Sequence, residues 1–144
     1  MIQQEFTISL RVKHPVYSDR LIAESLGMTP EIAHGQGAPR TTPTGRPLEG
    51  SYKETYCVFG LIDQQSGWFV EGVRGLLPSL AKHREFLSSI ADTGGSSELY
   101  IGVFVDGGDS AGFSLDSSTM AALADLHVKL AAEFYWKGIA QAFV

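Results

Sequence analysis

The clearest hydrophobic pattern lies in residues 98–116, where apolar side chains fill both alternating sets of positions. One set comprises Leu99, Ile101, Val103 and Val105, and the other comprises Tyr100, Gly102 and Phe104. Apolar residues in both sets are typical of an interior strand whose two faces are covered. The following Asp106-Gly107-Gly108-Asp109 tolerates a positive φ, so we predict a turn and then a second, shorter strand through Phe113 and Leu115.

The N-terminal segment shows a stricter alternation. Between residues 5 and 13, every second side chain is apolar and the others are polar, which predicts a half-buried strand with one solvated face. Ser18 is a suitable N-cap for a short helix with Ile22 and Leu26 on one side. Gly27 stands where such a helix ends in the left-handed conformation.

The middle of the chain predicts one strand and two helical segments. Alternation over residues 52–62 indicates a strand, and residues 64–67 indicate a turn. From Trp68 the apolar spacing becomes helical. Because proline lacks a backbone donor and clashes with the preceding turn, we expect a break near Leu77 and a second helix that runs from Pro78 to about Asp92.

The C-terminal region completes an α+β fold in a single domain over residues 1–144. Asp116 or Ser117 caps a helix, and alternation from Val128 to Phe134 predicts a last strand. The final six elements read β-α-β-β-α-β, a ferredoxin-like core to which the first strand and helix are added. We therefore expect a mixed or antiparallel sheet of about five strands with helices on one face.

Composition and charge limit the classes of partner. The 144 residues are 44% hydrophobic and 19% charged, values typical of a globular domain. The net charge of −5 arises wholly in residues 91–144, which carry two basic and seven acidic side chains. This balance argues against a general binder of nucleic acid or of anionic membranes, which needs a basic field.

Targeting and cysteine signals predict a cytoplasmic protein. The start of the chain lacks a basic region followed by an apolar run, so we expect no signal peptide. No stretch approaches the roughly 20 apolar residues that span a bilayer. The single cysteine, Cys57, excludes an intrachain disulfide and lies within an apolar strand, where a buried, inert thiol is the expected state.

Residues 27–51 hold the best candidate for a binding site. This segment contains five glycines and four prolines, so we expect an irregular loop. Loops of such length are functional or mobile in compact domains. Within the Gly/Pro-rich stretch 35–50, the glycines expose backbone donors and the two arginines offer forks for a carboxylate or phosphate. The candidate ligand-binding residues are Arg40, Thr41, Thr42, Gly45 and Arg46. The alternative is an exposed surface loop, because neither the Walker nor the dinucleotide motif is present.

Other motifs favour structural interpretations. Asp106-Gly107-Gly108-Asp109 lacks the full ligand pattern of a calcium loop. The four histidines lie far apart and show no metal-ligand spacing, so we expect no metal and no cofactor. Trp136 and the apolar C-terminal tail either form a patch suited to a homodimer contact or close the end of the core.

Several short motifs together resemble the bacterial family known as domain of unknown function 4279. They are an N-terminal Leu-Arg-Val strand, Ile-x-x-x-Leu-Gly-x-x-Pro from Ile22 to Pro30, Gly37, Gly45-Arg46, Thr55 and the C-terminal hairpin, helix and strand. The resemblance covers roughly residues 6–136 and implies a small, single-domain bacterial protein. Many members have tryptophan where this chain has Cys57. The family supplies no activity and no catalytic residues.

Two functional hypotheses follow. The first is a non-enzymatic binding or protein-interaction module, because no acid, base, nucleophile and metal set converges in the pattern. The second is recognition of a small anionic ligand through loop 35–50, with or without hydrolase activity on an unknown substrate. An ordered loop that borders a concavity would favour the second hypothesis.

Overall fold

The computed structural model describes residues 4–108 and 111–137. A five-stranded sheet has the order β2-β5-β1-β6-β7, and β3 and β4 form a separate two-stranded sheet. The elements, in chain order, are β1 (Gln4–His14), α1 (Asp19–Leu26), β2 (Ile32–His34), β3 (Pro39–Thr41), β4 (Pro47–Ser51), β5 (Thr55–Gly67), α2 (Phe69–Ala81), α3 (Arg84–Asp92), β6 (Ser96–Asp106), α4 (Ser117–Asp125) and β7 (Val128–Lys137).

The main sheet is mixed. β1 lies in its centre and runs antiparallel to both β5 and β6, and β2 runs antiparallel to β5. β6 and β7 are parallel and are joined through α4, as a parallel pair requires. The predicted α+β class and the mixed sheet of five strands are confirmed.

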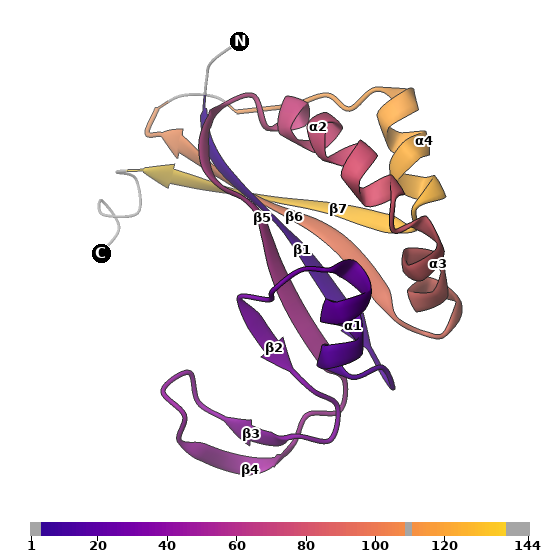
Figure 1. Cartoon of the computed structure of the whole chain (residues 1–144). Helices are drawn as coiled ribbons and strands as arrows, with labels where there is room; N and C mark the ends of the chain where they lie inside the picture. Colours follow the sequence, from indigo (N-terminus) through magenta and orange to yellow (C-terminus); the bar gives the residue numbers. More distant parts are fainter. Residues whose placement is uncertain (1–3, 109–110, 138–144) are drawn as a thin grey trace.

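All four helices cover one face of this sheet. Each contributes buried apolar side chains to a single core, where they meet the inward-facing residues of β1, β5 and β6. Figure 1 shows α2, α3 and α4 together on one side of the long strands, and α1 beside β1 and β5. The β3–β4 hairpin extends from the sheet at the end opposite to α2 (Figure 1). The predicted placement of helices on one face is confirmed.

Local signals explain the ends of two helices. The Ser18 side chain accepts a hydrogen bond from the Leu21 backbone N–H at 3.0 Å, and Gly27 closes α1 with φ of 64°. At α4, Asp116 accepts from the Thr119 N–H at 2.8 Å. This bond and the hydroxyl of Thr119, with Arg74 also close, hold the pKa of Asp116 at about 2. The predicted caps are confirmed.

The predicted strand pair in residues 98–116 is wrong in its second half. β6 forms, with Ile101 and Val103 completely buried, but residues 111–116 contain no strand. The Phe113 ring instead packs on Phe69, with ring centroids 5.2 Å apart. The C-terminal elements therefore read β-α-α-β-α-β rather than the ferredoxin-like order, and β1 is the central strand rather than an addition.

β6 also differs from the expected doubly covered strand. Helices cover only the face that carries Ile101 and Val103, whereas Tyr100 and Phe104 lie on the other face and remain partly exposed. The residues of β6 that face the helices are apolar because they belong to the core. The aromatic outer set belongs to a surface without helices, which becomes important below.

Three further boundaries differ from prediction. The segment 27–51 contains β2, β3 and β4 rather than an irregular loop. β5 continues through the predicted turn at residues 64–67. Pro78 lies inside α2, and the break comes later, at Lys82 and His83. No helix within the described residues is long and apolar enough to cross a membrane.

Candidate functional site

One face of the sheet is covered by no helix of residues 4–108 and 111–137, and this face, hereafter the open face, carries two rows of side chains that run across the strands. The antiparallel and parallel registers align residues of different strands at the same level. One row comprises His34, Tyr56, Lys13 and Ser96. The next comprises Ile32, Val58, Arg11, Glu98 and Lys129. Residues far apart in the chain thus form one continuous surface, polar and aromatic except for Ile32 and Val58.

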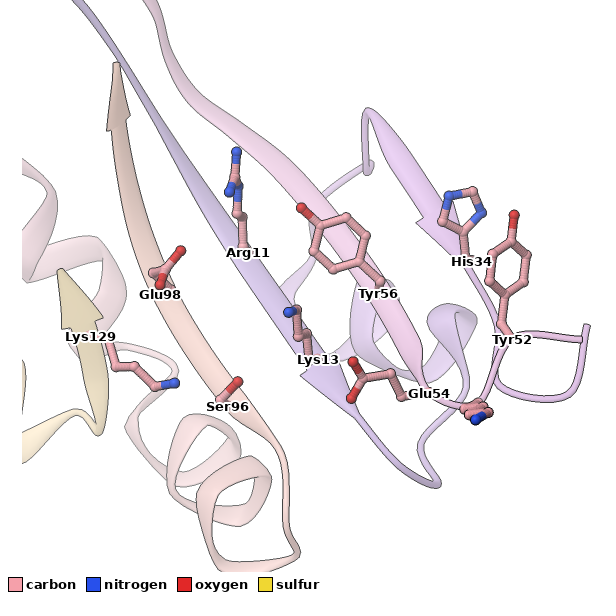
Figure 2. A pocket seen from close by; sticks show the side chains of 10 residues that line it. Arg11, Lys13, His34, Tyr52, Glu54, Tyr56, Ser96, Glu98 and Lys129 are labelled. Atoms are coloured by element: carbon pink, nitrogen blue, oxygen red, sulfur yellow. The ribbon is translucent and has the colours of Figure 1, made fainter. Parts of the chain in front are cut away.

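A concavity of about 500 Å³ lies over these rows. Its floor comes from β1, β5 and β6, and the connection from β4 to β5 adds Tyr52, Lys53 and Glu54 at its border. Figure 2 shows Arg11, Lys13, Tyr56, Glu98 and Lys129 projecting from the same side of the strands. His34 and Tyr52 lie side by side at the β2 end (Figure 2).

The concavity is basic although the protein is acidic. Its border holds four cations, Arg11, Lys13, Lys53 and Lys129, against two carboxylates, Glu54 and Glu98. Counting the Lys, Arg, Asp and Glu side chains, four minus two leaves an excess of two positive charges at the concavity, whereas the same count over the whole chain gives −5. Among residues 4–108 and 111–137, ion pairs form elsewhere, and none involves these six groups. Arg11 attracts the Glu133 carboxylate at longer range, and the lysines have no neighbour among the described residues that forms an ion pair with them, so a ligand can reach their charge.

Aromatic rings orient two of the cations. The Arg11 guanidinium lies 3.6 Å from the centroid of the Tyr100 ring, and the Lys13 ammonium lies 5.8 Å from that of Tyr56. Such contacts attract a cation through the quadrupole of the ring. Arg11 Nε is buried and has no hydrogen-bond partner among the described residues, and the Tyr100 ring and the attraction of the Glu133 carboxylate both act on the guanidinium.

The hydroxyl of Tyr100 belongs to a hydrogen-bonded group. This hydroxyl lies 2.6 Å from that of Tyr135, which donates to the Glu133 carboxylate at 2.5 Å. Burial and these neighbours raise the pKa of Tyr100, while the hydrogen bonds from Tyr135 and Tyr100 lower the pKa of Glu133. Tyr100 therefore stays neutral under Arg11, and the site has a fixed platform at this end.

The stacked pair of His34 and Tyr52 forms the opposite end. Their ring centroids are 4.3 Å apart with an interplanar angle of 21°. His34 comes from β2, and the backbone of Tyr52 bonds the start of the hairpin through Gly37 and Ala38. This pair therefore joins the main sheet to the β3–β4 hairpin.

The predicted site residues lie on that hairpin and only partly converge. Arg40, Thr41, Thr42 and Gly45 border a second concavity of about 680 Å³, whereas Arg46 does not. Arg40 donates to the Glu49 carbonyl at 3.3 Å, and the Thr42 hydroxyl accepts from the Arg46 backbone N–H at 2.9 Å. Gly45, with φ of 89°, makes the hairpin turn. The segment is ordered and borders a concavity, although the two arginines do not share it.

Cys57 and His14 are both buried in the core. Burial raises the pKa of the Cys57 thiol to about 11, and the Asp19 carboxylate adds to the effect, so the thiol is protonated near neutral pH. His14 is 1% exposed, and both of its ring nitrogens have hydrogen-bond partners: the backbone N–H groups of Val16 and Tyr17 just after β1, and the Thr93 hydroxyl. The described residues contain no group of three His, Cys, Asp or Glu side chains that could hold a metal ion.

The aromatic residues near the C-terminus form a chain of contacts. Phe134 lies between Phe69 and Trp136, with centroid distances of 6.3 and 5.9 Å. Trp136 retains 36% of its exposure, so the rings extend from the core to the surface. The predicted tail beyond Lys137 lies outside the described residues, as does Asp109.

The sequence pattern did not predict a binding site at the open-face cations. The alternation of residues 5–13 already placed Arg11 and Lys13 on a solvated face, but it carried no information on neighbouring strands. Only the strand order brings Lys129 and Tyr56 to the same surface. A polar row on a strand that proves to be central is the signal that could have directed attention there.

No protein-family model matches the chain, and neither a curated protein nor a solved structure matches it. The resemblance to domain of unknown function 4279 stays a prediction. The functional argument consequently depends on the geometry of the two concavities.

Proposed function

We propose that the protein is a non-enzymatic binding module whose ligand is a small anion held over the open face of the sheet. The observation that carries this proposal is the group of four cations without ion-pair partners around one concavity in an acidic protein. Charges on a protein surface are ordinarily balanced by neighbours or solvent, and a local excess attracts a ligand of opposite sign.

The chemistry of the border favours a carboxylate or phosphate with a planar or polar body. Arg11 offers a guanidinium fork, which suits planar oxyanions, and the lysines act as point charges. Tyr56 and Ser96 add hydroxyl groups that donate or accept hydrogen bonds, whereas the Tyr52 hydroxyl already bonds the Thr41 backbone. The Glu54 and Glu98 carboxylates would repel parts of an anion that approach them, which contributes specificity.

A second candidate is anion binding at the β3–β4 hairpin, as the sequence predicted. It is favoured by the position of Arg40, Thr41, Thr42 and Gly45 around one concavity. It is the weaker candidate because Arg40 already donates to the Glu49 carbonyl and Arg46 lies outside the lining.

Location and assembly stay predictions. The proposed module is a cytoplasmic bacterial protein, on the strength of the sequence features and the family resemblance given above. A homodimer contact through Trp136 is the corresponding prediction for its assembly.

The test is a titration with citrate at low ionic strength, followed by NMR. Replacing Lys13 and Lys129 with glutamine should weaken citrate binding at least tenfold and leave the unfolding midpoint unchanged. The matched control, Arg20→Gln with Lys82→Gln, removes the same charge from exposed positions in α1 and directly after α2, and it should bind citrate as the parent does. Added salt should weaken binding, because exposed charges are screened over about 8–10 Å.

Three outcomes would decide between the candidates. Equal losses in the site and control variants would reduce the effect to net charge and overturn the proposal. Loss only on Arg40→Gln with Arg46→Gln would move the site to the hairpin. A parent protein that does not bind citrate, phosphate or acetate would also contradict the proposal.

A further inference from the structure

The two concavities meet at the stacked pair of His34 and Tyr52. Both residues border the basic concavity over the open face and also the second concavity beside the hairpin. We refer to the second as the hairpin groove; its remaining lining residues are Glu31, Ile32, Ala33, Arg40, Thr41, Thr42, Pro43, Gly45 and Leu48. One ligand could therefore contact both spaces by passing along the two rings.

The hairpin groove has a different character from the basic concavity. Ile32 and Leu48 are large apolar side chains that are 46% and 44% exposed, and both border it. Arg40 and Glu31 are the charged residues among its described lining, one of each sign. Exposed apolar side chains that gather in one groove indicate that an apolar group is buried there on binding.

We infer that the ligand is an anionic amphiphile, such as a medium-chain alkyl carboxylate. This inference depends on the proposed function, because the anionic head is held by Lys13, Arg11 and Lys129 over the open face. The apolar chain then crosses the His34 and Tyr52 rings and lies against Ile32 and Leu48. The chemistry of each end of the ligand matches the concavity that receives it.

A small amphiphile fits this arrangement better than a peptide that adds a strand to the sheet. β2 is the edge strand beside the groove, and it is only three residues long. Strand addition takes its affinity from a run of main-chain hydrogen bonds along the edge. Three residues provide few such bonds, whereas the two joined concavities suit an elongated molecule.

The experiment compares acetate, hexanoate and decanoate at fixed low ionic strength, with decanoate below its micelle-forming concentration. Each buried methylene strengthens binding by up to about fourfold. Because the groove is open on one side, we expect decanoate to bind at least tenfold more tightly than hexanoate. Equal affinities for the three carboxylates in the parent protein would overturn the inference directly.

Two pairs of variants separate the head from the tail. Ile32→Ser with Leu48→Ser should remove most of the dependence on chain length and leave citrate affinity unchanged. The control Val16→Ser with Met120→Ser changes exposed apolar residues outside both concavities, and it should retain the full dependence. Lys13→Gln with Lys129→Gln should lower the affinities for hexanoate and for decanoate by the same factor.

The two proposals fail in different ways. If chain length has no effect, or its effect persists in Ile32→Ser with Leu48→Ser, the amphiphile is wrong while citrate binding still supports the anion site. If Lys13→Gln with Lys129→Gln leaves the affinity for the carboxylates unchanged, the proposed anion site itself is wrong. Decanol, which has the chain but no charge, should bind more weakly than decanoate by at least the factor lost on removing both lysines.

Discussion

The two faces of the five-stranded sheet come from the same strands but carry different side chains: one face belongs to the core, and the other borders the basic concavity. On β1, the side chains of Phe6, Ile8, Leu10 and Val12 are at most 1% exposed and meet the helices. The alternate residues face away from the helices, and two of them, Arg11 and Lys13, border the basic concavity. Alternation by one residue thus places core side chains and concavity-lining side chains on opposite faces of the same strand.

The difference between the faces predicts at which positions an amino-acid substitution is tolerated. Inner-face side chains pack closely, so a substitution there leaves a cavity or an overlap. Charged side chains in the open-face rows lie outside the core, so a substitution of a lysine there should change ligand binding more than folding. The predictions below test this division, from the largest expected effect on stability to the smallest.

The largest effect should come from Ile101→Ala on the inner face of β6. Ile101 is fully buried in the strand between β1 and β7, and truncation there should cost about 2–5 kcal/mol through lost burial and the remaining cavity. Chemical denaturation measures the loss. Lys129→Ala, on the open face of the neighbouring β7, should change stability by less than about 0.5 kcal/mol. Similar losses in both variants would remove the distinction between the faces.

A smaller loss is expected from Gly95→Ala, where α3 leads into β6. A Cβ at this position would lie 2.6 Å from the Lys13 carbonyl oxygen and 2.8 Å from Ile90 Cγ2. Such overpacking costs about 1–3 kcal/mol. The control, Gly75→Ala in α2, meets no atom within 4 Å and should be neutral or stabilise by up to about 1 kcal/mol. A neutral Gly95→Ala in denaturant unfolding would mean that the β1–β6 corner is looser than described.

The smallest effect concerns the pH dependence that His14 confers. Its Nδ1 accepts the N–H groups of Val16 and Tyr17 at 3.0 and 2.8 Å, so Nε2 carries the proton and donates to the Thr93 hydroxyl at 2.7 Å. Burial lowers the pKa of His14, so the unfolded chain takes up a proton more readily than the folded one. The stabilisation is complete above the unfolded pKa of about 6.5 and falls as pH decreases through the folded pKa.

Denaturant unfolding at pH 7.5, 6.5 and 5.5 measures this dependence. The free energy of unfolding should decrease over this range in the parent protein and change less in His14→Gln. The lowered pKa values of Glu5 and Glu133 act at lower pH, since their ordinary value is 4.5. An identical slope in both proteins would assign the pH dependence to other groups.

Elements with local signals could be predicted from the sequence. The alternation of β1, the Ser18 and Gly27 ends of α1 and the Asp116 cap of α4 depend on neighbours within a few residues. The strand predicted through Phe113 does not form, because the Phe113 ring packs on Phe69 and Phe134, which lie far away in the sequence. Tertiary contact of this kind overrides local alternation.

The hairpin and the site show two other limits. Gly37 and Gly45 have positive φ and lie in the turns between β2 and β3 and between β3 and β4, so two of the glycines that suggested an irregular loop instead connect short strands. The basic concavity requires Arg11, Tyr56 and Lys129 to be neighbours across three strands. Strand order is a property of the whole fold, which alternation along one strand does not specify.

The most direct measurement of the central claim follows the lysines one by one. Reductive ¹³C-methylation keeps the charge of each ammonium group and gives every lysine its own NMR signal. Lys13, Lys53 and Lys129 border the basic concavity, whereas Lys82 lies at the end of α2 and Lys137 is paired with Glu5. On titration with citrate, the first three signals should move together with one saturating affinity, and the other two should stay in place. Movement of all five signals in proportion to exposure, or of Lys82 and Lys137 alone, would contradict the open face as the binding surface.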